Sequence, residues 1–288
     1  MNHYPSNVKE KLNSIILSMA EHHWLFSKNP GHDFTRQHLG KLSFYDTMRL
    51  IISMGKGSTN DEIMDYFDLD PDLIPSQSAF CQRRRQISLS AFEYLFSEFS
   101  SSFPSTTDKF KDHCILACDG CHVVYATNSD IIEDYNKPRL IDYKGYNHMH
   151  LNGFVDVISK AFLDVVIQPG QQPDEREALH SMLDHFTPDD PQKYIITADR
   201  GYESYDLLFH CELKNLGYVF RVKSPSSPKS ILSYYASEFP DDLEDFDVTI
   251  KRFFTDKATN IMKSQSDVYR YILSLIHISE PTRHAQIS

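Results

Sequence analysis

Two aspartates stand at apolar stretches of the sequence, each with a glycine close behind. Asp119 interrupts the run 114–125 (CILACDGCHVVY), and Asp199 directly follows the run 194–198 (YIITA). A carboxylate is costly to bury without a partner, and glycine allows a sharp turn or the close approach of a ligand. Two carboxylates at one sheet edge repel each other unless a cation neutralises them. Mg²⁺ (or Mn²⁺) prefers such oxygen ligands, so the pair predicts a metal site for in-line phosphoryl transfer.

The spacing alone leaves a second interpretation open. Two unrelated strand-end aspartates would serve equally well as turn residues that cap the next element. His122 and the segment 148–150 (HMH) lie near Asp119 in the sequence, but nothing beyond this proximity supports a role for them. Asp156 and Asp164 interrupt two β-rich runs and are expected to face outward.

The five cysteines predict neither a disulfide framework nor a complete zinc site. They are few, odd in number and scattered over a chain of 288 residues, unlike the dense sets of small secreted proteins. Cys118-x-x-Cys121 is half of a zinc motif, but a tetrahedral site usually needs a second pair and none follows. A strand that contains small apolar cysteines is the favoured interpretation.

The first hundred residues show helical periodicity. Apolar spacing, caps and glycine stops predict helices at 8–24, 44–54, 63–67, 77–87 and about 91–99. Ser76 has the position of an N-cap for the fourth of these helices. The stretch 100–107 (SSSFPSTT) has the composition of a linker.

After the linker the pattern changes to short apolar runs that alternate with helical segments. The predicted order is strand, hairpin, helix, strand, helix, strand, at 114–125, 150–168, 173–185, 194–198, 202–216 and 218–223. This order predicts an α/β fold in which helices pack on a mixed sheet.

Three stretches resemble the DDE-type transposases of bacterial insertion sequences, in particular the group often called the IS-four group. They are ILACDGCHV around Asp119, IITADRGYES around Asp199, and HLNGFVDVISKAFLDVVIQPG between them. The resemblance covers about residues 30–225. It implies a ribonuclease H-like catalytic domain in which Asp119 and Asp199 are the first two catalytic aspartates and ligands of Mg²⁺ or Mn²⁺. It also implies that LSFYDTMRLIISMGKGSTNDEIMDYF and PSQSAFCQRRRQI belong to a helical DNA-binding region.

The sequence departs from this group at the third acid. The group carries its glutamate in a Tyr-x2-Arg-x3-Glu-x6-Lys signature on a late helix, and no such string occurs here. Glu203, Glu212, Glu238 and Glu244 follow Asp199 before the tail, but none stands in the signature. We therefore expect this chain to be cut off before its last catalytic carboxylate.

The tail 273–288 (LSLIHISEPTRHAQIS) is of a different kind. Its first eleven residues resemble a translated sequencing-library adapter, so the natural sequence is expected to stop near Ile272. The expected organisation is a helical DNA-binding domain at 1–105 and a partial ribonuclease H-like catalytic domain at 106–225. The start of an inserted segment is expected at 226–272, with the adapter-derived tail at 273–288.

Duplex DNA, as element ends and target, is the partner that the resemblance implies. The net charge of −11 opposes this, but residues 1–110 hold 11 Lys and Arg against 13 Asp and Glu, which leaves them nearly neutral. Arg83, Arg84 and Arg85 are the best candidates for phosphate contacts, although a solvated charged face would show the same residues. No signal peptide or membrane span is predicted, so we expect a cytoplasmic protein without a membrane partner. A homo-oligomer is compatible with the resemblance.

Three functions remain open. The leading one is an enzyme fragment of a metal-dependent transposase, inactive because it lacks the third carboxylate. The second is a protein that binds DNA ends without cutting them. The third is a ribonuclease H-like nuclease, which the N-terminal helical region disfavours because a plain nuclease does not need it.

Overall fold

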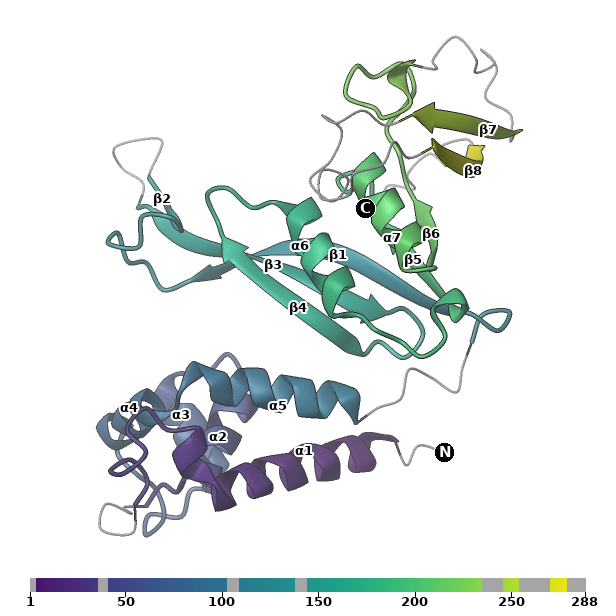
Figure 1. Ribbon diagram of the computed structural model, residues 1–288. Coiled ribbons are helices and arrows are strands. Elements are labelled where there is room, and N and C mark those ends of the chain that lie inside the picture. Colours follow the sequence, from purple (N-terminus) through teal and green to yellow (C-terminus); the bar gives the residue numbers. More distant parts are fainter. Residues whose placement is uncertain are drawn as a thin grey trace, which may run out of the picture. The chain divides into compact units, whose positions relative to one another are not determined.

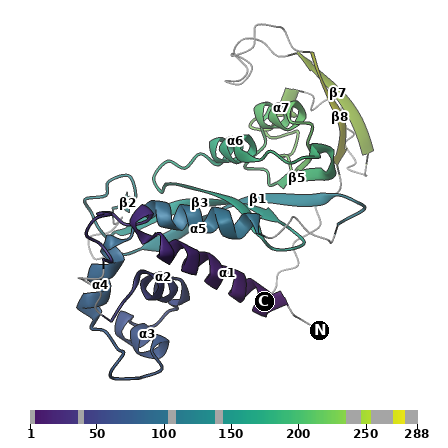
Figure 2. The same cartoon turned by 60° about the horizontal axis from the view of Figure 1, so that its bottom comes forward.

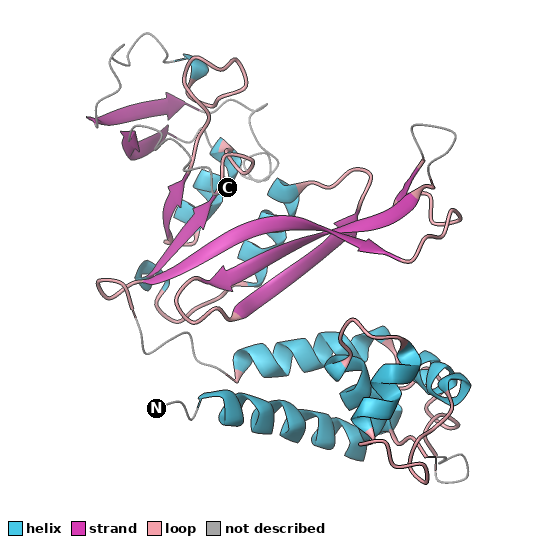
Figure 3. Ribbon diagram, turned by 180° about the vertical axis from the view of Figure 1, so that it is seen from behind, coloured by secondary structure: helices cyan, strands magenta, loops and turns pink. Residues whose placement is uncertain are grey.

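The computed structural model describes residues 4–35, 41–102, 109–137, 144–234, 246–253 and 270–278. The chain divides into two compact units, Met1–Pro104 and Ser105–Ser288. The described part of the first unit is helical apart from its connections, and all the named strands belong to the second unit (Figure 3).

The first unit consists of α1 (Tyr4–Glu21), α2 (Phe44–Ser53), α3 (Thr59–Tyr66), α4 (Gln77–Gln86) and α5 (Leu89–Ser101), with a short 3-10 turn at His23–Leu25. Serine side chains at 43, 58 and 76 each accept a hydrogen bond from a backbone N–H of the helix that follows. These bonds satisfy donors that a helix start leaves free. The expected cap at Ser76 is therefore confirmed.

Two apolar clusters hold these helices together. One joins α1, α2 and α5 around Ile16, Met48 and Ala91, all completely buried. The other joins α2, α3 and α4 around Leu50 and Phe80. Helices of this length gain most of their stability from such packed faces and little from their own propensity.

The second unit contains a six-stranded sheet (Figure 1). Its strands are β1 (Cys114–Tyr125), β2 (Tyr135–Asn136), β3 (Tyr146–Asp156), β4 (Phe162–Pro169), β5 (Tyr194–Ala198) and β6 (Gly217–Phe220). The neighbours run β2-β3-β1-β5-β6, and β4 also pairs with β3. β3 is antiparallel to β1, β2 and β4, whereas β5 is parallel to both β1 and β6. The expected α/β fold, N-terminal helices followed by a mixed sheet, is confirmed.

Helices α6 (Glu175–His185) and α7 (Tyr205–Leu213) lie together on one face of this sheet (Figure 2). Their apolar sides meet the strands in a single core that includes Leu116, Phe154, Leu179 and Leu207, each completely buried. Asp174 caps α6 by accepting hydrogen bonds from two backbone N–H groups of its first turn. Helix α6 packs on β3 and β4, and its N-terminus lies beside both strands.

The strand predicted at 114–125 is confirmed as β1, with Asp119 inside it. Two other sequence-based expectations need correction. Asp156 does not face outward: it is completely buried and accepts hydrogen bonds from the backbone of Ile158 and Ser159 in the β3–β4 turn. The helix expected from 202 begins only at Tyr205, because Ser204 caps it and the preceding residues form a turn.

The end of the chain is described only in part. β7 (Phe246–Phe253) and β8 (Arg270–Ile278) form a separate antiparallel pair. β8 includes residues 273–278 of the expected tail, of which 273 and 276–278 pair through the backbone with β7. Residues 279–288, most of the linker expected at 100–107, and both Glu238 and Glu244 lie outside the described residues. Among the helices that are described, none combines the length and apolar character needed to cross a membrane.

Candidate active site

Asp119 and Asp199 follow equivalent positions on neighbouring strands. In the parallel ladder between β1 and β5, the last residue pair is Cys118 with Ala198. Each aspartate is the next residue along its own strand, and both are exposed. Neighbouring strands lie about 4.8 Å apart, so the ladder brings the two aspartates to the same end of β5.

Backbone hydrogen bonds hold both carboxylates. Asp119 Oδ1 accepts from the N–H of Gly120 at 2.9 Å, and Asp199 Oδ1 accepts from the N–H of Gly201 at 2.8 Å. The N–H of Tyr202 also donates to the carbonyl of Asp199, which closes a tight turn after β5. The turn leaves Asp199 exposed, whereas the ring of Tyr202 is buried in the core.

Beneath the aspartates lie two buried side chains, Cys118 and Tyr202, which are 3% and 1% exposed. Burial raises the pKa of the Cys118 thiol to about 12, and the charges of Asp119, Glu175 and Asp199 act in the same direction. Burial is likewise the main cause that raises the pKa of Tyr202. Both groups therefore stay neutral below three nearby carboxylates.

Glu175 is the carboxylate that the sequence did not reveal. It is the first residue of α6, and its Oε2 lies 2.8 Å from the position that a Cβ at residue 201 would occupy. Asp199 Oδ1 lies 3.0 Å from the same position. The two carboxylates thus border one small space above Gly201, which a larger residue would fill.

His150 reaches the same region from β3. It is 3% exposed, and its Nε2 lies 3.4 Å from Glu175 Oε1. Neither ring nitrogen has a hydrogen-bond partner among the described residues. A Cβ at Gly120 would stand 2.4 Å from the same Nε2, so the ring rests against the backbone next to Asp119.

The sequence carried a weak signal for His150 but none for Glu175. His150, Asn152 and Phe154 alternate along β3, so two buried polar side chains precede a core residue on the same face. Buried polar groups without an evident role often mark a site. Glu175, by contrast, is one of two glutamates in the first turn of α6, and only the fold distinguishes it from Glu177.

The donor set fits a hard divalent cation. It consists of exposed carboxylates above glycine backbone, with a buried histidine that lacks hydrogen bonds, and oxygen donors suit Mg²⁺ and Mn²⁺. Over the ranges that the structure describes, no three His, Cys, Asp or Glu side chains are already gathered around one ion position. Asp119 and Asp199 would hold an ion together with water and phosphate oxygens, as such sites commonly do.

Two glutamates that follow Asp199 in the sequence already have partners, and the Cys118-x-x-Cys121 motif does not form a site. Glu203 is 1% exposed and pairs with Lys223 at 2.6 Å. Glu212 accepts a hydrogen bond from the hydroxyl of Tyr218. Cys118 is buried whereas Cys121 is exposed, so the half zinc motif does not present two thiols to one ion.

The three arginines of the first unit differ from one another. Arg83 is 9% exposed, lies with its Cζ 5.2 Å from the centre of the Phe34 ring, and donates to Gln86. Burial lowers the pKa of Arg83, and nearby Asp33 opposes that shift. Arg84 and Arg85 are exposed at the end of α4.

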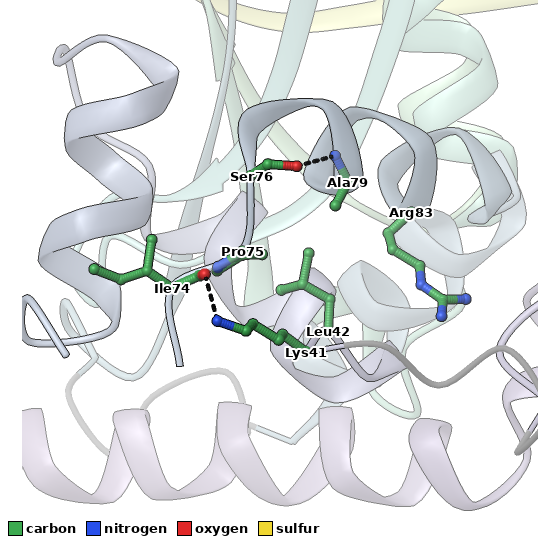
Figure 4. Close-up of a pocket in the computed structure, with 7 residues that line it drawn as sticks. All are labelled: Lys41, Leu42, Ile74, Pro75, Ser76, Ala79 and Arg83. Atoms are coloured by element: carbon green, nitrogen blue, oxygen red, sulfur yellow. Dashed lines mark hydrogen bonds between the residues drawn. The ribbon is translucent and has the colours of Figure 1, made fainter. Parts of the chain in front are cut away.

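A shallow hollow beside α4 involves Arg83 as well (Figure 4). It has a volume of about 260 Å³ and is lined by Lys41, Leu42, Ile74, Pro75, Ser76, Ala79 and Arg83. Its polar groups are already used: Lys41 Nζ donates to the carbonyl of Ile74 at 3.1 Å, and Ser76 caps α4. We assign it no function.

Comparison with known proteins identifies the second unit. A search among curated proteins found no match to the chain. A family model described as "Transposase DDE domain" matches residues 110–273, more than half of the chain, and its range includes Asp119, Glu175 and Asp199. The chain therefore belongs to the DDE transposase family.

Proposed function

We propose that this chain comes from an insertion-sequence transposase of the IS-four group, with Asp119 and Asp199 as its first two catalytic carboxylates. Members of the DDE transposase family cut and join DNA and generally use divalent metal ions. The observation that carries the assignment is the parallel pair Cys118–Ala198, because it sets both aspartates side by side at the end of β5.

Each aspartate has a defined part in this chemistry. Asp119 and Asp199 would hold the cation, Mg²⁺ or Mn²⁺, whose charge would offset their mutual repulsion. The bound ion supplies activation of the attacking water or 3′-hydroxyl and stabilisation of the leaving oxygen. The backbone N–H groups of Gly120 and Gly201 each donate to one oxygen of these carboxylates and thereby orient them.

The first unit is proposed to bind duplex DNA. Arg84 and Arg85 are exposed on the last turn of α4 and suit phosphate contacts, which depend on local positive charge. Arg83, which was grouped with them on sequence alone, packs against Phe34 and supports the helix. The DNA-binding proposal for Arg83 is therefore the weaker one, and Arg84 and Arg85 carry it.

Residues 1–288 by themselves are proposed to bind DNA without cutting it. Two-metal transfer needs enough ligands to hold both ions against the scissile phosphate. The family group's late-helix glutamate has no counterpart in a Tyr-x2-Arg-x3-Glu-x6-Lys string within these residues. We therefore propose DNA-end binding without cutting for residues 1–288, and transposase activity for the protein from which they come.

The test uses this chain and a version extended by the native genomic sequence beyond the codon for Ile272. Both are purified and incubated with labelled element-end DNA and Mg²⁺ or Mn²⁺. The extended chain should cut, and Asp119→Asn and Asp199→Asn in it should abolish cutting while leaving DNA binding intact. Cutting that survives both substitutions would overturn the assignment of the aspartates. Equal cutting by the short chain would overturn its proposed inactivity.

A further inference from the structure

We propose that Glu175 is a third cation-binding carboxylate of this site and that His150 positions it. The proposal rests on the proposed function, because the cation is the one that Asp119 and Asp199 would hold. It concerns cation binding only. The glutamate that completes the second ion's ligands in strand cutting is a separate requirement.

The first argument is the space that Glu175 shares with Asp199. Each residue directs one carboxylate oxygen to within 3.0 Å of the point where a Cβ at residue 201 would stand. No glycine of the described chain has a positive φ, so residue 201 does not need glycine for its backbone conformation. What the glycine provides is room for two carboxylates to approach the same backbone.

The second argument is that α6 is tied down on both sides of Glu175. Before it, the side chain of Gln168 accepts from the N–H of Asp174 at 3.1 Å and donates to the carbonyl of Asp174 at 2.9 Å. After it, Arg176 Nε donates to the carbonyl of Gly201 at 3.3 Å. The helix start is thereby fixed both to β4 and to the turn that carries Asp199.

The third argument is the buried histidine. His150 is only 3% exposed, and neither of its ring nitrogens has a hydrogen bond among the described residues. Its Nε2 faces Glu175 Oε1. A buried polar ring without hydrogen bonds is costly, so its presence calls for a partner at the site. Holding Glu175 Oε1 gives it that partner and leaves Oε2 beside Gly201.

Asn152 connects the start of α6, through Gln168, with the turn after β5, through Tyr202. Its Nδ2 donates to Gln168 Oε1 at 3.3 Å, and its Oδ1 accepts from the hydroxyl of Tyr202 at 3.4 Å. The same Gln168 oxygen accepts from Asp174, the cap of α6. Outer partners of this kind orient cation ligands, and their loss typically weakens metal binding about 10–100-fold.

The test is Mn²⁺ binding by the full 288-residue chain, followed by the electron paramagnetic resonance signal of free Mn²⁺. Glu175→Gln keeps the shape and removes the charge, and should weaken binding at least about tenfold. Glu177→Gln is the matched control, because Glu177 is an exposed glutamate in the same first turn of α6. Its affinity should equal that of the unsubstituted chain.

Further variants test the role of His150 and provide a second substitution of Glu175. His150→Gln should weaken Mn²⁺ binding about tenfold while the melting temperature stays close to that of the unsubstituted chain, which a purely structural role does not predict. Glu175→Asp, which keeps the charge, should restore part of the affinity lost in Glu175→Gln and serves if the glutamine variant folds poorly. Equal affinities for Glu175→Gln and Glu177→Gln overturn the proposal for Glu175.

Asp119→Asn and Asp199→Asn are measured in the same titration. If they weaken binding and Glu175→Gln does not, the proposed function stands and only the inference about Glu175 fails. If neither aspartate variant changes the affinity, the proposed metal site fails and the role of Glu175 fails with it.

Discussion

Glu175 and Asp199 each place a carboxylate oxygen within 3.0 Å of the position that a side chain at residue 201 would occupy. The two residues come from different elements, the start of α6 and the end of β5. The carboxylates of Glu175 and Asp199 therefore both lie beside Gly201.

Gly201→Ala is expected to weaken Mn²⁺ binding with little loss of stability. A methyl group at residue 201 would displace the ends of both carboxylates, which are flexible, and the backbone there needs no glycine conformation. The free energy of unfolding should change by less than about 1 kcal/mol. Gly31→Ala is the control, because nothing lies within 4 Å of its Cβ position. Unchanged Mn²⁺ affinity in Gly201→Ala would show that the carboxylates do not need this space.

The exposed arginines of α4 should affect DNA binding through salt dependence. If Arg84 and Arg85 contact phosphates, alanine at either position should reduce the slope of log K against log salt concentration by about 0.9. The loss should be similar on all duplex sequences, as phosphate contacts carry no sequence information. Fluorescence anisotropy at several salt concentrations measures this. An unchanged slope in the double variant would contradict the proposed contacts.

Arg83→Ala should behave differently from its neighbours. Arg83 packs on Phe34, donates to Gln86 and is only 9% exposed. Its removal should lower the free energy of unfolding by about 1–3 kcal/mol, measured by urea denaturation. A stability equal to that of Arg84→Ala would show that the packing contributes nothing.

Local patterns predicted most of the elements. Helices and strands follow from the spacing of apolar residues, and Ser76 was identified as a cap because serine accepts a bond from the helix start. Asp119 and Asp199 were singled out because each stands beside an apolar strand and a glycine, and their catalytic role stays a prediction that the family resemblance implies. Each of these signals lies within a few consecutive residues.

The remainder depended on contacts between distant segments. Glu175 resembles Glu177 in sequence, and only the packing of α6 on β3 and β4 brings it toward His150 and Gly201. Asp156 was expected to face outward because it interrupts a β-rich run, in which the polar positions usually face solvent. The fold instead buries it, because its carboxylate satisfies backbone N–H groups in the turn after β3.

Asp156→Ala should therefore destabilise the second unit. The substitution leaves the N–H groups of Ile158 and Ser159 without their carboxylate acceptor, and a lost buried hydrogen bond costs about 1–3 kcal/mol. Asp164→Ala is the comparison, because Asp164 is less buried and pairs with exposed His185. A loss of stability no greater than that of Asp164→Ala, in thermal or urea unfolding, would contradict the structural role of Asp156.

The buried thiols give the last prediction, which concerns pH. Burial raises the pKa of Cys118 and of Cys211 to about 12, whereas an unfolded cysteine ionises near pH 8.5. A raised pKa in the folded chain means that the stability contribution is full below about pH 8.5. It declines as the pH rises from there toward 12, because the unfolded chain releases these protons first. The melting temperature should fall over this range, and Cys118→Ala should lessen the fall.

At pH 8 a thiol reagent should label exposed Cys121 quickly and Cys118 only as fast as the chain unfolds, which peptide mass spectrometry measures. Equal labelling of Cys118 and Cys121 in the folded chain would show that Cys118 is not buried in the core as the structure describes.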